Sequence, residues 1–520
     1  MAHTATWLLC GWLGWAGLAA ALELSPEEAA GKQIYLHGTS RTADAVIHAR
    51  VGAGDTALPA AVVPCASCHG SDGRGRSEGG VRPPDITWRR LSAPYGQRLA
   101  RGRQYPAYDE ASLARVLTEG LDPAGNRLDP AMPRFVMSLR DMANLTAYLK
   151  RLEDDRDPGL HEEVVRLGTL LPSAGPLAEP GRTVAAVLRG ALEQLNRRGG
   201  IHGRRLELVV ADPGGDRASA EAALGELLER QDVFALVAPL APALEGRYAA
   251  LLAETGVPLV GPLASFAEDE GSRLVFAPLP GLREQMFALA DFAAGDLQLA
   301  DPEALIAYPG EARQQALAEA LAGRLRQRGW GRVQLLRYGS GAPVAGQPVG
   351  PGLQAVFFLG PAEAFVALAT ALHEGGRAPY LFAAAPQVAG AALGIAPQFS
   401  RRLFLAYPFL PGDWTPAGSA ALQAVRQSGG LSGPPAPLQV GAYSALLVLA
   451  EGLKRAGRDA SREKLLNALE NLHGFQTGVT PEIGFGPGRR VGAPGAHIVV
   501  VDLEQAQLRP TGRYLKVDTP

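Results

Sequence analysis

Cysteine is scarce in this chain, which has three cysteines among its 520 residues. So few thiols argue against a disulfide-rich scaffold, and without a second cysteine pair they also argue against a structural zinc site of about four nitrogen and sulfur ligands. An excess of charge of one sign is lacking as well. The net charge is −2, which gives no reason to expect nucleic acid as a partner. After residue 22 no apolar run reaches the ~18 residues of a membrane-spanning helix. The composition is otherwise globular, and the length indicates two to four compact units.

Two of the three cysteines stand in the run Cys65-Ala66-Ser67-Cys68-His69. C-x-x-C-H is the attachment motif of a c-type haem, in which the thiols bond to the haem vinyl groups and the adjacent imidazole coordinates the iron. A thioredoxin-like dithiol would need a βαβ context, but a glycine-rich stretch from Gly70 to Gly75 follows here. The sequence therefore predicts one covalent haem c on Cys65 and Cys68, with His69 as an axial iron ligand.

The N-terminus carries the one long apolar stretch, residues 6–22, which ends in Ala19-Ala20-Ala21. Such a stretch before an A-x-A pattern is typical of a secretory signal peptide. We therefore predict a signal peptide over residues 1–21 and a periplasmic mature protein, which agrees with the attachment of c-type haem outside the cytoplasm. Because no Lys or Arg precedes the stretch, an uncleaved membrane anchor stays open as the alternative.

The iron needs a second axial ligand, and a methionine paired with the histidine raises the reduction potential. Met132 stands in Asp129-Pro130-Ala131-Met132-Pro133, which cannot be helical and can therefore cover a haem face as a loop. We predict Met132 as the iron ligand and Met137 as its alternative, whereas Met142 is expected to pack in the core. His37 and His48 are the fallback ligands.

Helices are predicted at both ends of the segment around the haem motif. Ser25-Pro26-Glu27-Glu28 combines a cap, a proline in the first turn and first-turn acids. Near residue 150, apolar residues recur at helical spacing after a cap at Ser138. The domain predicted in this way covers residues 22–153.

Two terminal helices around C-x-x-C-H resemble the small single-haem cytochrome c fold, which is all-α. The matching residues are Gly31, Ile34, Tyr35, the haem motif, Met132-Pro133 and Ala147-Tyr148-Leu149. The resemblance implies electron transfer as the role of this domain. The connection at 39–64, between the first helix and the haem motif, is longer than is usual in the family, and we expect it to shield the haem edge or to contact a partner.

Arginine is concentrated beside the haem motif. Residues 74–103 hold eight arginines and only two acidic residues, Glu78 and Asp85. The arginines are Arg74, Arg76, Arg82, Arg89, Arg90, Arg98, Arg101 and Arg103. One interpretation is a basic rim that steers an acidic redox partner. The other is that one or two of them contact the haem propionates while the rest form an ordinary solvated surface.

The pattern changes after a charged segment closed by Pro158-Gly159, which is typical of a linker and is placed at 154–163. Short apolar segments then alternate with amphipathic ones. Strands are predicted at 164–171, 205–211, 234–238, 258–260, 304–308, 333–337 and 355–359, and helices at 183–197, 218–229, 248–254, 283–293, 315–328 and 362–373. This alternation predicts parallel sheets flanked by helices, and two such sets in series predict two α/β lobes.

Residues 164–520 resemble the type I periplasmic solute-binding proteins, the family of the branched-chain amino acid binders. The matching segments are 170–178, 195–196, 199–209, 211–216 and 256–262. The resemblance implies two lobes that close over a small solute by a hinge motion, with hinges near 277–283 and 405–412. It also implies a membrane permease as a further partner.

The expected ligand cleft departs from that of amino acid binders. The loop Ala238–Ala243 has no hydroxyl, and Phe382–Ala385 stands where the family has an acidic loop. A buried zwitterion without partners would cost several kcal/mol, so we expect a less polar solute, or an acid paired with Arg313. A cleft that binds nothing also stays open. The candidate ligand-binding residues are Ser173, Ser265, Arg313 and Tyr407.

Three functions fit these features. The first is an exported electron carrier that exchanges electrons with a periplasmic dehydrogenase or another cytochrome, and whose fused module binds a small ligand that is not an amino acid. The second is a substrate-binding receptor or sensor of the ABC-transporter type, with haem as an accessory redox group. An enzyme ranks last, because His/Met-ligated iron has no open position. We therefore favour the electron carrier.

Overall fold

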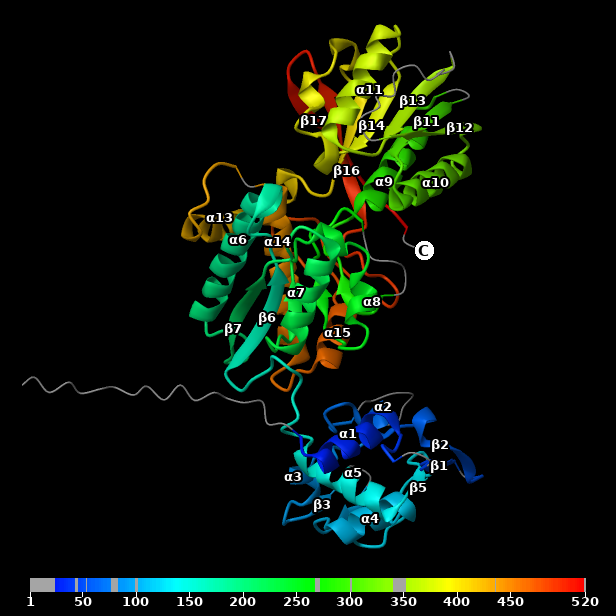
Figure 1. The fold of residues 1–520 in the computed structure, drawn as a ribbon, viewed down its shortest axis with the longest axis vertical. Helices are drawn as coiled ribbons and strands as arrows, with labels where there is room; N and C mark the ends of the chain where they lie inside the picture. Colours follow the sequence, from blue (N-terminus) through cyan, green and yellow to red (C-terminus); the bar gives the residue numbers. More distant parts are fainter. Residues whose placement is uncertain are drawn as a thin grey trace, which may run out of the picture. The chain divides into compact units, whose positions relative to one another are not determined.

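The computed structural model describes residues 24–518 except 43–44, 53, 76–82, 99–101, 267–271, 300–301, 340–351 and 435. The chain divides into two compact units, Met1–Arg156 and Asp157–Pro520 (Figure 1). Within the segment predicted as a linker, Asp155 pairs with Lys32 of the first unit at 2.7 Å, whereas the Asp157 carboxylate accepts from the backbone N–H of Arg462 in the second. The predicted signal peptide, residues 1–21, lies outside the described residues.

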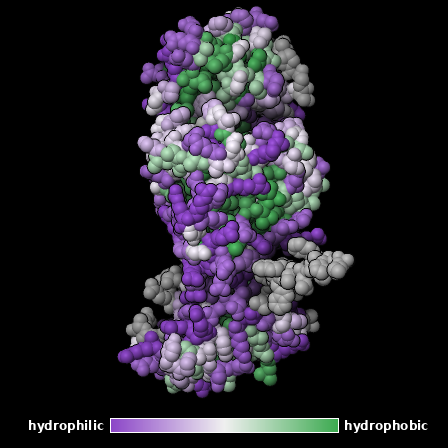
Figure 2. Space-filling view, turned by 90° about the vertical axis from the view of Figure 1, so that its left-hand side faces the viewer, coloured by the Kyte–Doolittle hydropathy of each residue, from purple (hydrophilic) through white to green (hydrophobic). Residues whose placement is uncertain are grey.

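Helices α1 (Pro26–His37) and α5 (Leu139–Arg151) frame the first unit. Both begin where the sequence predicts, because the hydroxyls of Ser25 and Ser138 accept hydrogen bonds from backbone N–H groups three residues further on. Hydrophilic side chains cover much of the face of this unit that Figure 2 draws. The apolar sides of the two helices are turned inward, into one core.

The two helices cross closely at Gly31. A Cβ atom at this position would lie 2.0 Å from the carbonyl oxygen of Asn144 and 2.6 Å from the Cβ of Tyr148. One turn further along, the rings of Tyr35 and Tyr148 have centroids 5.6 Å apart. The missing side chain of Gly31 therefore allows the two helices, and the aromatic residues on them, to pack together.

The other elements of the first unit are short. The helices are α2 (Cys65–His69), α3 (Trp88–Leu91) and α4 (Glu110–Thr118), with a 3-10 turn η1 (Ala60–Val62). The strands are β1 (His48–Val51), β2 (Thr56–Pro59), β3 (Gln97–Arg98), β4 (Gln104–Tyr105) and β5 (Arg134–Val136). Antiparallel pairing gives a sheet in the order β2-β1-β5 and a separate pair β3-β4. The long connection at 39–64 thus forms two strands and a turn, which the all-α expectation for this domain did not include.

The first lobe of the second unit has a parallel sheet in the order β10-β9-β8-β6-β7. Its strands are β6 (Val164–Leu170), β7 (Arg205–Ala211), β8 (Ala235–Val237), β9 (Leu259–Val260) and β10 (Val275–Phe276). One face packs on α6 (Ala178–Arg197), α13 (Pro416–Ser428), α14 (Pro437–Ala456) and α15 (Arg462–Glu470), and the other on α7 (Arg217–Glu229) and α8 (Tyr248–Leu252). Alternate residues of β8 enter the two cores, as the pleat of a strand requires.

The second lobe has a sheet in the order β12-β11-β13-β14-β15-β16-β17. Its strands are β11 (Glu303–Pro309), β12 (Arg332–Tyr338), β13 (Leu353–Phe358), β14 (Tyr380–Ala384), β15 (Leu403–Tyr407), β16 (Gly495–Asp502) and β17 (Gln507–Lys516). One face packs on α9 (Leu282–Gly295) and α10 (Ala312–Gln327), and the other on α11 (Ala362–Glu374) and α12 (Ala385–Val388). The strands from β12 to β15 are parallel, whereas β16 and β17 are antiparallel additions. The remaining single turns are η2 (Gly175–Leu177), η3 (Pro242–Leu244), η4 (Ala392–Gly394), η5 (Pro397–Phe399) and η6 (Pro411–Asp413).

Within its described residues, the second unit crosses between its lobes at three places. These lie after β10, after β15 and between α15 and β16. The first and third crossings run side by side, because the backbone N–H of Ala277 donates to Arg490 and its carbonyl accepts from Gly492, both at 2.8 Å. The first two lie at the segments 277–283 and 405–412, whose hinge role stays a prediction. Nowhere in the described chain is a helix both long and apolar enough to cross a membrane.

Candidate functional site

The first unit encloses a cavity of about 1690 Å³. Apolar and aromatic side chains from α1, α4, β5 and α5 form much of its wall, including Tyr35, Leu113, Phe135, Leu145 and Leu149. Cys65, Cys68 and His69 of α2 also line it. Because pockets for drug-sized ligands range from about 300 to 1,000 Å³, this cavity accommodates a larger group, and it brings the haem motif and an apolar wall together.

The haem motif begins its short helix directly after Pro64, and His69 is 5% exposed at its end. The Nδ1 atom of His69 lies 3.1 Å from the carbonyl oxygen of Pro84. A hydrogen bond to this carbonyl leaves Nε2 as the free nitrogen, which is the usual second-sphere arrangement of a metal-binding imidazole. Burial lowers the pKa of His69, so the ring is neutral near pH 7, the form that coordinates iron.

Burial also raises the pKa of the Cys65 thiol to about 12. Neither Cys65 nor Cys68 forms a disulfide, and Cys68 is exposed. Both thiols are therefore available for covalent attachment. The cavity size, the apolar wall, the two thiols and the neutral imidazole fit a haem c, which supplies the one-electron redox couple when it is bound.

Met132 lines the same cavity, in the loop between α4 and β5. The loop is non-helical from Asp129 to Pro133, as predicted. Met137 and Met142 pack partly buried against the core and are not among the residues that line the cavity. The fallback ligands His37 and His48 are exposed and are not among the lining residues either. The structure thus brings Met132 together with the haem motif, and its role as the iron ligand stays a prediction.

Three arginines line the haem cavity, namely Arg74, Arg103 and Arg127. Arg103 forms an ion pair with the fully buried Asp122 at 3.8 Å, and its guanidinium lies 5.1 Å from the ring centre of Tyr105. Arg127 stands outside the basic run at 74–103, so the sequence pattern did not single it out. Cationic groups at the cavity wall suit the two propionates of a haem.

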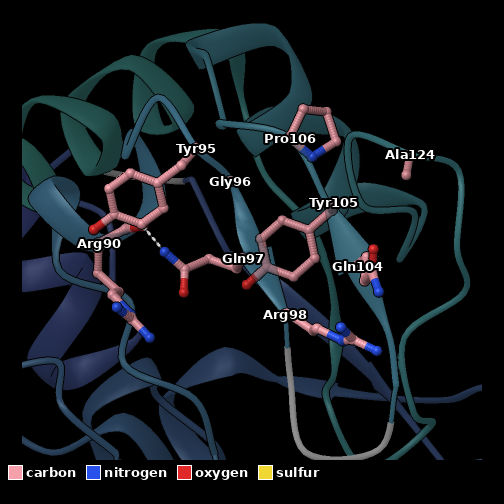
Figure 3. Close-up of a pocket in the computed structure, with 9 residues that line it drawn as sticks. All are labelled: Arg90, Tyr95, Gly96, Gln97, Arg98, Gln104, Tyr105, Pro106 and Ala124. Carbon is pink, nitrogen blue, oxygen red and sulfur yellow. Dashed lines mark hydrogen bonds between the residues drawn. The ribbon is translucent and has the colours of Figure 1, made fainter.

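A second and shallower pocket of about 550 Å³ opens at β3 and β4 (Figure 3). We call it the arginine pocket. Its lining residues are Arg90, Tyr95, Gly96, Gln97, Arg98, Gln104, Tyr105, Pro106 and Ala124. Tyr95 is 81% exposed, and the Gln97 side-chain amide donates to the carbonyl of Arg90 at 3.0 Å. None of its described lining residues is acidic, and Tyr105 borders both it and the haem cavity.

The arginine run at 74–103 is therefore divided between different environments. Arg74 and Arg103 reach the haem cavity, whereas Arg90 and Arg98 line the arginine pocket. Arg89 is paired with Glu153 at 3.3 Å. The other three arginines, Arg76, Arg82 and Arg101, lie outside the described residues. Both interpretations of the run, propionate contacts and a docking rim, thus find residues that suit them.

The candidate ligand residues of the second unit have different surroundings. The Ser173 hydroxyl donates to the carboxylate of Asp212, which lowers the pKa of Asp212. Ser265 is exposed, and Tyr407 is half-buried at the end of β15. Arg313, in the first turn of α10, lies against the backbone of Gly246 in the first lobe. Its Nη1 atom is buried and has no hydrogen-bond partner among the residues that the structure describes. Of the four residues, only Arg313 has a buried side-chain polar atom without a hydrogen-bond partner in the described part of the chain.

The two units match two different families of known proteins. Residues 59–153 match the family model described as Cytochrome c, and residues 164–507 match the model described as Periplasmic binding protein. A curated relative is a chemotactic signal transduction system substrate-binding protein, BasB, of Halobacterium salinarum. It is 28% identical over 208 residues, which cover 38% of this chain and 50% of that protein. The chain thus spans about half the length of this relative.

Solved structures resemble the second unit. A leucine binding protein from Thermotoga maritima is 18% identical with a TM-score of 0.54, and the match covers 68% of this chain and 98% of that one. A fatty acid ABC transporter substrate-binding protein from Thermomonospora curvata is 16% identical with a TM-score of 0.56, covering 70% and 95%. At these identities the likeness shows the fold, which is the two-lobed fold that the sequence predicted.

Proposed function

Because the chain belongs to the periplasmic binding protein family and carries a cytochrome c domain ahead of that fold, we propose that it is a periplasmic electron carrier with a fused solute-binding module. One observation carries the redox part, namely the apolar cavity that brings Cys65, Cys68 and His69 together with Met132. Two axial donors on one haem leave no position for a substrate and suit electron transfer. We therefore propose no enzymatic role.

The redox partner that we propose is acidic, and it docks at the arginine pocket. Arg90 and Arg98 place two guanidinium groups in a pocket whose described lining residues include no carboxylate, and the exposed ring of Tyr95 lies beside Arg90 (Figure 3). Arginine and tyrosine are common anchors of protein interfaces, and unbalanced positive charge accelerates the approach of an anionic partner. Tyr105 then separates the docked partner from the haem cavity by one side chain.

Electron exchange with small charged reagents tests this proposal. We expect the haem-loaded protein to be reduced and re-oxidised reversibly, and its oxidation by ferricyanide, an anion, to slow as the salt concentration rises. Removing both charges in Arg90→Gln/Arg98→Gln should slow that oxidation several-fold, because the anion is no longer attracted. Stopped-flow absorbance of the haem measures the rates.

Two controls allow the docking site and the role as an electron carrier to be tested independently. Arg89→Gln removes a guanidinium that is 80% exposed but already paired with Glu153, so it should leave the ferricyanide rate almost unchanged. A cationic oxidant, tris(phenanthroline)cobalt(III), should not slow in the double variant. Equal ferricyanide rates in the double variant and the parent would reject the docking site. Failure of the protein to cycle reversibly would reject the carrier.

For the solute-binding module we propose a carboxylate as the ligand group and Arg313 as its partner. The buried Nη1 atom of Arg313 has no hydrogen-bond partner within the described residues, and a buried charged donor gains most from an ionised acceptor. The Ser173 hydroxyl is already bonded to Asp212, which leaves fewer groups for the ammonium and carboxylate of an amino acid. The same residues suit the alternative role of a substrate-binding receptor for transport or signalling, of which the name of the BasB relative, a chemotactic signal transduction protein, favours signalling.

A thermal-shift screen of small organic acids, alcohols and amino acids tests the ligand class. We expect an organic acid to raise the melting temperature, because a ligand at 100 times its Kd stabilises the folded state by about 2.7 kcal/mol. Arg313→Gln should abolish that shift. Arg326→Gln, an exposed arginine on the same helix, is the matched control and should keep it. Stabilisation by leucine, or a shift that survives in Arg313→Gln, would contradict this assignment.

A further inference from the structure

The loop that carries Met132 is bonded at both ends to one side chain, that of Arg134 in β5. The Nη1 atom of Arg134 donates to the carbonyl oxygen of Met132, and its Nη2 atom donates to the carbonyl oxygen of Leu128 at 3.0 Å. Between these carbonyls the loop has short-range bonds to Asp129, since the Ala131 N–H donates to its carboxylate and the Met132 N–H to its carbonyl oxygen, both at 3.0 Å. Arg134 therefore closes the loop from one side, as a two-pronged clamp.

The guanidinium of Arg134 occupies a space that only glycine leaves free. Gly120, just after α4, has φ +72°, and a Cβ there would lie 1.8 Å from the Nε atom and 2.2 Å from the Cζ atom of Arg134. The carbonyl of Gly120 in turn accepts from the Leu128 N–H at 2.8 Å. Gly120, Leu128 and Met132 thus surround one guanidinium, which is held between α4 and the loop.

The clamp is anchored in the small sheet of the first unit. Arg134 lies in β5, and its neighbour Phe135 is buried opposite Ala49 of β1. The backbone of Arg134 pairs in register with Arg50, whose own guanidinium points to Asp55 at 3.3 Å. A side chain that starts from a paired strand has a fixed origin, so its two hydrogen bonds restrict where the loop lies.

We propose that Arg134 is a positioning residue that holds Met132 against the haem iron. This inference rests on the proposed role of Met132 as the axial ligand. The planar guanidinium reaches two carbonyls at once, whereas a lysine ammonium is a point donor that cannot match that geometry. Without the clamp, binding of the sulfur to iron must also order the loop, which costs backbone entropy for each residue that is ordered.

Competition by imidazole measures how firmly the sulfur is held. Imidazole must displace the methionine from ferric iron, so its apparent affinity rises by the factor by which methionine ligation weakens. A hydrogen bond to a charged donor contributes about 1.5–3 kcal/mol, so we expect Arg134→Gln to bind imidazole about tenfold or more tightly than the parent. The long-wavelength absorption band of methionine-ligated ferric haem should weaken in parallel. Absorbance titration of the full-length, haem-loaded protein gives both readouts.

The companion variants separate positioning from general damage. Arg134→Lys keeps the charge but loses the two-pronged geometry, and it should resemble Arg134→Gln. Gly120→Ala leaves Arg134 in place but fills its space, and it should tighten imidazole binding as well, even where Arg134→Gln fails to fold. Arg50→Gln removes the arginine paired opposite on the sheet and should leave imidazole affinity unchanged.

Variants of Met132 distinguish a wrong clamp from a wrong axial ligand. In a Met132→Ala background, Arg134→Gln should change imidazole affinity no further, because a double-mutant cycle isolates the coupling of the two residues. Parental imidazole affinity in Arg134→Gln and Gly120→Ala, with a strong effect of Met132→Ala, would overturn the clamp alone. Parental affinity in Met132→Ala would overturn both the clamp and the axial ligand.

Discussion

The Met132→Ala variant should have a much lower reduction potential than the parent, and its reduced form should bind carbon monoxide. Methionine sulfur raises the potential of a histidine-ligated haem, and axial ligands set haem potentials over a span of about 0.8 V. Removing the sulfur therefore lowers the potential by a sizeable fraction of that span. If Met132 is the axial ligand, its removal also opens a coordination position on the iron. Redox titration and reduced spectra with and without carbon monoxide measure the two effects.

Met137→Ala is the matched control for this prediction. Met137 lies five residues further along the chain and packs partly buried against the same core, but it is not among the residues that line the haem cavity. Its removal should leave potential and carbon monoxide binding as in the parent, at a small cost in stability. If Met137→Ala lowers the potential and Met132→Ala does not, the axial ligand is Met137 and the loop has been assigned the wrong role.

Gly31→Ala should destabilise the first unit by about 1–3 kcal/mol, the usual cost of overpacking. The added Cβ would lie 2.0 Å from the carbonyl oxygen of Asn144 and 2.6 Å from the Cβ of Tyr148. Both of these atoms are fixed to the α5 backbone, so relief requires the helices to move apart. The gain of about 1 kcal/mol in helix propensity when alanine replaces glycine offsets only part of this cost. Thermal unfolding followed at the haem absorption reports on this unit, and the melting temperature should fall by several degrees.

Gly54→Ala in the same unit separates this clash from the general effect of replacing a glycine. Only Thr56 Oγ1, at 4.0 Å, approaches a Cβ at position 54, and the φ of Gly54 is not positive. This variant should melt within a degree or two of the parent. An unchanged melting temperature in Gly31→Ala would show that α1 and α5 can separate without loss, which the closeness of their packing contradicts.

The sequence predicted the framework of the first unit because its signals are local. Ser25 and Ser138 were placed as helix caps by their position before apolar periodicity, and their hydroxyls bond as expected. The Cys65–His69 run needs no tertiary information, since the chemistry of attachment fixes its spacing. The loop at Met132 was predicted from its two prolines. Each of these inferences depends on residues within a few positions of one another.

In the second unit, the alternation of strands and helices also predicted the two lobes. Strands β16 and β17 were missed, because β16 joins the sheet by antiparallel pairing with β15, about ninety residues earlier in the chain, and β17 in turn pairs with β16. The third crossing between the lobes was missed for the same reason. Such pairings depend on which sheet edge is free once the rest has folded, and no local pattern records that.

By itself, the sequence determined which cofactor the first unit can attach, because two thiols and an imidazole stand at haem spacing. It also determined the order of the two families along the chain. Only the tertiary structure decided which residues meet. It brought Met132 rather than His37 or His48 to the cavity of the haem motif. It placed the guanidinium of Arg134 on the carbonyls of Leu128 and Met132. It left one nitrogen of Arg313 buried with no hydrogen-bond partner among the described residues. The physical reason is that hydrogen bonds and burial depend on distances in space, which the packing of α1 on α5 and of each sheet on its helices sets.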